Sequence, residues 1–279
     1  MFYLPFKFQE LKEYTTPRGP NFNWGWPMNF TVNGNKIHLH APFNRASGPH
    51  GPSNPHGPRP DYNLDGLYLK SISSKDNIWG SLPILYKVWD FYGPWFTGRL
   101  ARLEFRMHIL TPREIKEDSS YFHPRTFESV IADFLTYRYK GDVSDGRQRS
   151  FTPINWQPIE SLPCIAARCE VAPNKRINGS DIKYYAFFPI SDHHLIVLFF
   201  YMSRDRIYIG SERQDREISV NKAPVEELIT NILNSIELTL TLETKELQRK
   251  AVEGLDDTSV TKSFLPLQWA GNTNDLKLL

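Results

Sequence analysis

Residues 195–202 read Leu-Ile-Val-Leu-Phe-Phe-Tyr-Met, a run in which apolar and polar side chains do not alternate. Successive side chains of a β-strand point to opposite faces of a sheet, so this run predicts a strand that is covered on both faces. The run is far too short to cross a bilayer, for which a helix needs about 20 apolar residues. We therefore expect the central strand of a sheet here, with a layer packed on each side.

The segments on either side of this run supply further strands and a cover. Two β-rich segments, 165–171 and 182–188, precede it and predict additional strands. The cover is expected from residues 224–235, where apolar side chains recur at helical spacing and Pro224 suits the first helical turn. The apolar stripe of this helix consists of Val225, Leu228, Ile229, Ile232 and Leu233.

Beyond this helix the sequence predicts two shorter elements and a tail. Residues 236–242 alternate and favour an edge strand. Residues 245–253 favour a charged helix, in which Glu246 and Lys250 pair across one turn and which Gly254 stops. The tail, residues 256–279, carries few structural signals, so it either crosses the body of the protein as a strap or is presented to a partner.

Three features together carry a resemblance to a known group of proteins. They are the segment from Tyr184 to Asp192, the apolar strand that follows it as far as Met202, and the helix that ends with residues 231–236. In this order of elements the chain resembles the Mog1/PsbP-like α/β/α sandwich proteins over roughly residues 150–240. The resemblance implies a sheet between helices and a binding or adaptor role, and it implies no catalytic residue.

The N-terminal half contains a clear hairpin. Asn33 and Gly34 stand between two alternating runs, and Asn-Gly is a preferred two-residue hairpin loop. With this loop, Met28, Phe30, Ile37 and Leu39 share the apolar face. The polar face then holds Thr31, Lys36, His38 and His40.

Four more elements are predicted before residue 140, of which the first two are strands near residues 67–72 and 84–92. Residues 103–109 alternate strictly, which is typical of a half-buried antiparallel strand. Its polar face would carry Arg102, Glu104, Arg106 and His108. At residues 127–139 the apolar period becomes that of a helix, and Gly141 follows as a stop signal.

Together these elements predict an α+β protein with two similar halves, each an antiparallel sheet covered by a helix, followed by a C-terminal helix and an extended tail. The polar segment 141–149 is the best boundary, so the halves are residues 1–148 and 149–255 and the tail is 256–279. Whether the halves are separate domains stays open. Residues 41–63, rich in Pro, Gly and His, predict an extended loop in which Pro-His-Gly-Pro occurs twice.

Charge and composition remove some classes of protein. The chain of 279 residues has 33 Lys+Arg and 31 Asp+Glu, interleaved along the sequence, so it lacks the basic surface that nucleic-acid binding usually requires. Residues 1–10 show no secretory signal, so a soluble protein in the cytoplasm is expected. Cys164 and Cys169 match neither redox nor zinc spacing and are expected to be thiols, with a disulfide as the alternative.

Common catalytic signatures are absent from the sequence, which favours a protein that is not an enzyme without excluding one; the catalytic residues are unknown. The best chemical candidate is His38 with His40, because residues two apart on a strand face the same side and could share a divalent transition metal. The alternative is a pair of solvent-facing histidines and no cofactor. Asp192, His193 and His194 are adjacent and predict a turn rather than a catalytic dyad.

Two aromatic clusters lie beside loop residues and are candidate binding sites. Their members are Trp24, Trp26, Trp95 and Phe96. Large rigid aromatic side chains anchor protein interfaces, although they also line the edges of hydrophobic cores. Arg102 and Arg106 could hold a carboxylate or a phosphate, but Glu104 between them offers an internal partner.

The first functional hypothesis is a non-enzymatic interaction protein, such as an adaptor, a toxin-neutralising immunity protein or a chaperone for a secreted partner. It predicts a protein partner, no nucleic acid and no membrane span, and it leaves the oligomeric state open. The second is a metal-dependent hydrolase or metal-binding protein that uses His38 and His40. The third is a small-molecule binding domain in which Arg102, Arg106 and the tryptophans line a cleft.

Overall fold

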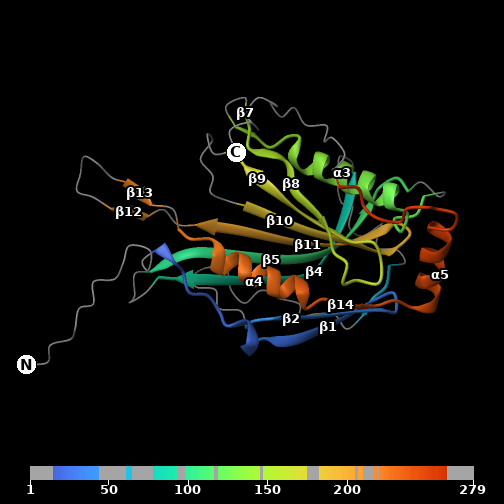
Figure 1. The fold of residues 1–279 in the computed structure, drawn as a ribbon, viewed down its shortest axis with the longest axis horizontal. Coiled ribbons are helices and arrows are strands. Elements are labelled where there is room, and N and C mark those ends of the chain that lie inside the picture. The colour runs from blue at the N-terminus through green and yellow to red at the C-terminus, as the bar shows by residue number, and fades with distance from the viewer. Residues whose placement is uncertain are drawn as a thin grey trace, which may run out of the picture.

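The computed structural model describes residues 15–43, 61–64, 78–93, 98–115, 119–144, 147–174, 182–204, 207–209, 216–218 and 220–262. Its largest element is a six-stranded antiparallel sheet with the strand order β4-β5-β11-β10-β9-β8 (Figure 1). The strands are β4 (Trp79–Tyr92), β5 (Arg99–Pro112), β8 (Ser150–Pro158), β9 (Ala167–Pro173), β10 (Ile182–Ser191) and β11 (His194–Arg204).

Strand β11 is the central, doubly covered strand that its sequence predicts. It lies between β5 and β10, and residues 195–200 are all buried. Its even-numbered residues, Ile196, Leu198, Phe200 and Met202, enter one hydrophobic core. Its odd-numbered residues, Leu195, Val197 and Phe199, enter a second core on the other face of the sheet. The absence of alternation in the sequence therefore has a simple cause, since both faces are buried.

Helix α3 (Pro124–Tyr139) covers one face of the sheet. Its buried residues Phe127, Ile131, Phe134 and Leu135 pack against the odd-numbered residues of β9, β10 and β11. The helix predicted at 127–139 is thus confirmed. It begins earlier, at Pro124, because His123 caps it: His123 Nδ1 accepts a hydrogen bond from the Arg125 backbone N–H at 3.2 Å.

Helix α4 (Ala223–Asn234) and a smaller sheet cover the opposite face. All five residues of the predicted apolar stripe of α4 are buried. They form one core with β5, β10, β11 and the smaller sheet. Figure 1 shows the resulting layers, with α3 above the six-stranded sheet and α4 and the smaller sheet below it.

The smaller sheet has four strands in the order β14-β2-β1-β3. Its strands are β1 (Trp26–Val32), β2 (Asn35–Ala41), β3 (Asp61–Tyr62) and β14 (Glu237–Thr239). The predicted hairpin is confirmed, with Phe30 opposite Ile37 and both loop residues in the left-handed region, Asn33 at φ 48° and Gly34 at φ 79°. Strand β14 forms one edge of this sheet by pairing with β2, which confirms the predicted edge strand.

The α+β class is confirmed. The predicted boundary at 141–149 does not separate the two sheets, because strands from both sides of it pair with each other. Strands β4 and β5 precede that boundary and β8–β11 follow it, yet residues 101–110 of β5 pair with residues 195–204 of β11. In the smaller sheet, β14 pairs with β2 from the first part of the chain. Each sheet is therefore assembled from both parts of the sequence.

The remaining elements are short. Helix α5 (Leu242–Ala251) contains the predicted pair, with Lys250 Nζ 4.0 Å from Glu246 Oε1, and Gly254 follows at φ 78°. A 3-10 turn, η1 (Phe22–Trp24), precedes β1. Two ribbons consist of β6 (Val143–Ser144) with β7 (Arg147–Gln148) and β12 (Ile207–Ile209) with β13 (Arg216–Ile218). No helix in the described ranges is long and apolar enough to cross a membrane.

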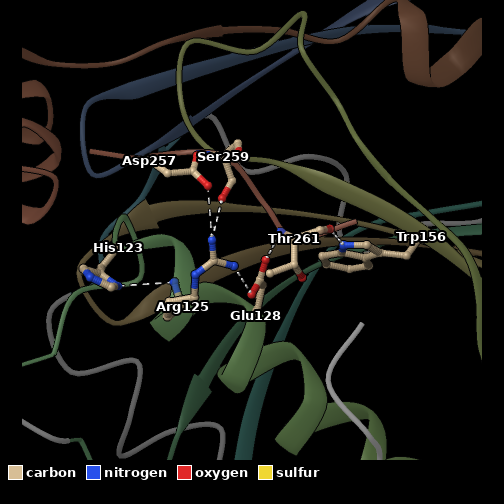
Figure 2. A network of polar contacts seen from close by, with 7 residues as sticks. All are labelled: His123, Arg125, Glu128, Trp156, Asp257, Ser259 and Thr261. Atoms are coloured by element: carbon tan, nitrogen blue, oxygen red, sulfur yellow. Dashed lines mark hydrogen bonds and ion pairs between the residues drawn. The ribbon is translucent and has the colours of Figure 1, made fainter. Parts of the chain in front are cut away.

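Residues 257–261 form a strap at the N-terminal end of α3, where Asp257, Ser259 and Thr261 contact Arg125 and Glu128 (Figure 2). Buried Glu128 of α3 accepts hydrogen bonds from Arg125 Nη1 at 2.7 Å and from the Thr261 backbone N–H. The Thr261 carbonyl in turn accepts a hydrogen bond from Trp156 Nε1 of β8 at 2.9 Å, and Val260 joins the α3 core. These contacts favour a strap for this part of the tail; residues 263–279 lie outside the described residues.

Candidate functional site

An exposed aromatic surface lies where η1 meets the start of β1. Gly25 follows η1, and a Cβ at this position would lie 2.5 Å from the Ala41 carbonyl oxygen and 2.6 Å from His40 Nε2. Only glycine therefore lets η1 lie so close to β2. The Phe22 ring then contacts the His40 ring with centroids 4.9 Å apart, and Trp24 is left 77% exposed.

Trp26 and Phe43 complete this surface. They are 61% and 55% exposed, and their rings meet edge to face with centroids 5.0 Å apart. The sequence between Arg18 and Lys36 contains no ionisable side chain. Aromatic side chains with few charges nearby are typical of the centre of a protein interface. We call Trp24, Trp26 and Phe43 the aromatic surface.

The second aromatic cluster predicted from the sequence, Trp95 with Phe96, lies outside the described residues, as do both Pro-His-Gly-Pro repeats. The backbone on either side of the cluster is described, and Gly93 N donates a hydrogen bond to the Gly98 carbonyl at 2.9 Å. This bond closes the connection between β4 and β5. The role of Trp95 and Phe96 stays a prediction.

His38 and His40 lie on one face of β2, as the alternation predicts, but they have different neighbours. His38 Nδ1 lies 2.7 Å from Asn29 Oδ1, whereas the His40 ring lies against Phe22. In the part of the chain that the structure describes, no group of three or more His, Cys, Asp or Glu is placed to hold a metal ion. The metal site therefore stays a prediction, which elemental analysis of the purified protein tests.

Arg102 and Arg106 each have a carboxylate partner within the protein. Arg102 Nε donates to Asp90 Oδ1 at 2.8 Å and its Nη2 donates to Asp90 Oδ2 at 3.3 Å, a bidentate pair. Arg106 Nη2 donates to Glu104 Oε2 at 2.8 Å, which is the internal pairing considered from the sequence. The Arg106 guanidinium also lies 5.0 Å from the centre of the Tyr86 ring.

Sequence reasoning missed a cleft of about 380 Å³ between α4 and the β8–β10 part of the sheet. Its polar lining comprises Asn155, Gln157, Arg168, Glu170, Tyr184 and Glu226. Ile229 and Leu233 of α4 supply apolar lining. The alternation of β9 places Arg168 and Glu170 on one face of a strand, and the sequence predicts α4 as a cover of this sheet, but neither pattern shows that a cleft remains between them.

Hydrogen bonds orient the polar groups of this cleft. Arg168 donates from Nε and Nη2 to Gln157 Oε1, at 3.1 and 2.7 Å. Glu170 Oε1 accepts from Asn155 Nδ2 at 2.9 Å. The Tyr184 hydroxyl donates to Glu226 Oε1 at 2.7 Å. Burial and this carboxylate raise the pKa of Tyr184, so the phenol stays protonated and keeps donating.

Two serine–histidine contacts resemble the start of a catalytic arrangement. Ser191 Oγ lies 2.8 Å from His194 Nδ1, beside the predicted turn between β10 and β11, and Ser81 Oγ lies 2.8 Å from His108 Nδ1. Burial lowers the pKa of both histidines to about 4, and Arg106 and Arg138 add to this effect at His108. Neither pair lines the cleft, so we interpret both as structural hydrogen bonds.

The two cysteines are free and buried. Burial raises the pKa of the Cys164 thiol to about 12, and it raises the pKa of Cys169 as well. Since the thiolate is the nucleophilic form, neither residue is suited to nucleophilic chemistry at neutral pH. The prediction of two thiols is confirmed.

Comparison with protein-family models, with curated proteins and with solved structures found no match to this chain. The resemblance to the Mog1/PsbP-like proteins therefore stays a prediction.

Proposed function

We propose that the protein binds a protein partner through its aromatic surface and acts without catalysis. The observation that carries this proposal is the exposure of Trp24, Trp26 and Phe43, since each leaves more than half of its surface in water. Contact with a partner would remove this apolar area from water, and aromatic residues dominate the energy of many protein interfaces. An adaptor, an immunity protein and a secretion chaperone are the classes of binder that we propose.

The local structure supports this role because it holds the aromatic anchors in place before binding. Trp26 belongs to β1, which pairs with β2 along its whole length. The backbone at Gly25 lies directly against β2, and Phe22 is held against His40. Anchors that are already ordered lose little conformational entropy when a partner binds.

The test compares the double variant Trp24→Ser, Trp26→Ser with the wild type in quantitative affinity purification from the native organism. The partner is then bound to purified protein to measure its affinity. We expect the double variant to bind at least about tenfold more weakly, because hot-spot residues each contribute about 2 kcal/mol or more. Its melting temperature should stay unchanged, since both side chains are exposed.

Leu242→Ser is the matched control. Leu242 is 85% exposed, but it lies at the start of α5, close to the other end of the β1–β2 hairpin. This variant should retain the partner. Equal retention by the wild type and by the double tryptophan variant would overturn the proposal.

A further inference from the structure

The cleft beside α4 presents one positive and one negative charge that do not pair with each other. Arg168 and Glu170 are two residues apart on β9 and so lie on the same face of the sheet. Among the described residues, the guanidinium bonds to Gln157 and the carboxylate bonds to Asn155, through one oxygen. Arg168 Nη1 and Glu170 Oε2 have no hydrogen-bond partner in that part of the chain. The amides orient the two charges without neutralising them.

A bulge in β8 brings both amides to the cleft. The register between β8 and β9 shifts between Ile154 and Gln157, so β8 carries an extra residue there. Asn155 takes the left-handed conformation, with φ 55°. Bulges re-aim side chains beside functional sites, and asparagine tolerates this conformation better than most residues with a Cβ. The two amides then hold the two charges separately.

The size and the apolar lining of the cleft suit a small organic molecule. Its volume of about 380 Å³ lies within the usual range of small-molecule sites, about 300–1,000 Å³. Ile229 and Leu233 are buried members of the main core that also line the cleft. Glu226 already accepts a hydrogen bond from the Tyr184 hydroxyl and forms an ion pair with Lys222, whose Nζ lies 2.7 Å away. The charges left for a ligand are therefore those of Arg168 and Glu170.

We propose that this cleft binds a small zwitterion of the amino-acid class with an apolar side chain. The ligand carboxylate pairs with Arg168, its ammonium pairs with Glu170, and its side chain packs on Ile229 and Leu233. Arginine matches a carboxylate in geometry as well as in charge. A ligand with a single charge would leave either Arg168 or Glu170 without a partner, so the cleft selects a zwitterion. The site does not involve the aromatic surface, so this proposal does not depend on the proposed function.

The ligand test uses the whole protein and a panel of free L-amino acids: leucine, isoleucine, valine, methionine and phenylalanine. Thermal shift and isothermal titration calorimetry measure binding at millimolar concentration. We expect at least one amino acid to raise the melting temperature. Its N-acetyl form lacks the ammonium and its amide lacks the carboxylate, and each should bind about tenfold more weakly or worse. Failure of the whole panel to bind, or equal binding of the three forms, would overturn the proposal.

Variants test whether Glu170 pairs with the ammonium of the ligand and Arg168 with its carboxylate. Glu170→Gln should weaken the free amino acid about tenfold while the N-acetyl form binds as it does to the wild type. Arg168→Gln should weaken the free amino acid equally while the amide form is unaffected. A variant that weakens every form alike would show that its residue shapes the cleft without pairing with the ligand, which overturns the assignment. Glu246→Gln and Arg249→Gln on α5 are the controls, because this exposed pair lies outside the cleft.

Discussion

Each face of the six-stranded sheet carries an arginine close in sequence to a glutamate, and the two combinations are arranged differently. On the α3 face, Arg125 Nη1 lies 2.7 Å from Glu128 Oε2, and Glu128 also holds the strap through Thr261 (Figure 2). On the α4 face, Arg168 and Glu170 share one side of β9, and each is held by an amide of β8. The first combination is closed, and the second is open to a ligand.

Burial accounts for this difference. Glu128 is 1% exposed, and a carboxylate so enclosed is stable only when cations and hydrogen bonds meet its charge. Arg168 and Glu170 are half-buried beside a cleft, where water solvates both groups. The comparison teaches that charged residues paired within the protein indicate a structural role. Charged residues that are oriented beside a cleft but not paired indicate binding.

The largest expected effect tests how strongly burial on the α3 face disfavours a charged imidazole at His108. His108 lies on this face, and burial, with Arg106 and Arg138 nearby, lowers its pKa from 6.5 to about 4. Between about pH 6.5 and about pH 4 the unfolded chain binds a proton that the folded protein does not, so the unfolding free energy falls as the pH falls through this window. We expect the unfolding free energy to fall by about 3 kcal/mol across this window. At pH values above or below the window, the contribution of His108 no longer changes with pH. Urea unfolding at both ends of the window measures it.

His108→Gln is the control for this measurement. Glutamine cannot take up the proton, so the variant should lose about 3 kcal/mol less than the wild type over the same pH range. His194, whose pKa is also lowered to about 4, remains in this variant and contributes its own loss. An unchanged pH dependence would mean that the α3 face tolerates a charged imidazole, and the contrast between the two faces would weaken.

The next effect concerns the closed network itself. Glu128→Ala removes the acceptor of Arg125 and Thr261 at once, and we expect the free energy of unfolding to fall by about 2 kcal/mol. Hydrogen exchange should also show faster exchange of the Thr261 amide, because the strap loses its attachment to α3. Glu246→Ala removes half of an exposed ion pair and should lower the free energy of unfolding much less than Glu128→Ala does. Similar losses for both variants would contradict the structural role of Glu128.

The elements that the sequence predicted correctly are those whose own residues carry the signal. The hairpin at Asn33-Gly34 follows from turn chemistry, and the register of β1 and β2 follows from the turn. Helix α4 follows from a five-residue stripe that is fully buried, and β11 follows from a run that is apolar on both faces. In each case local preference and tertiary packing agree, so local patterns were sufficient.

The pairing of distant segments and the cleft could not be predicted in this way. The sequences of β5 and β11 do not show that these strands are neighbours, because other strands of the chain could form the same backbone hydrogen bonds with either of them. Strand β8 escaped prediction because its bulge breaks the alternation at Asn155. The same bulge holds the polar side of the cleft, so the irregularity that hid the strand also marks the site.

The smallest effect sharpens the comparison directly. Arg168→Ala and Glu170→Ala should each change the free energy of unfolding by no more than about 0.5 kcal/mol, because both residues are partly solvated and neither is an ion-pair partner of the other. The double variant should be additive, whereas Arg125→Ala and Glu128→Ala should show a coupling of about 0.5 kcal/mol or more. Chemical denaturation of the single and double variants measures both cycles. A coupling between Arg168 and Glu170 as large as that between Arg125 and Glu128 would mean that the two faces of the sheet use their charges in the same way.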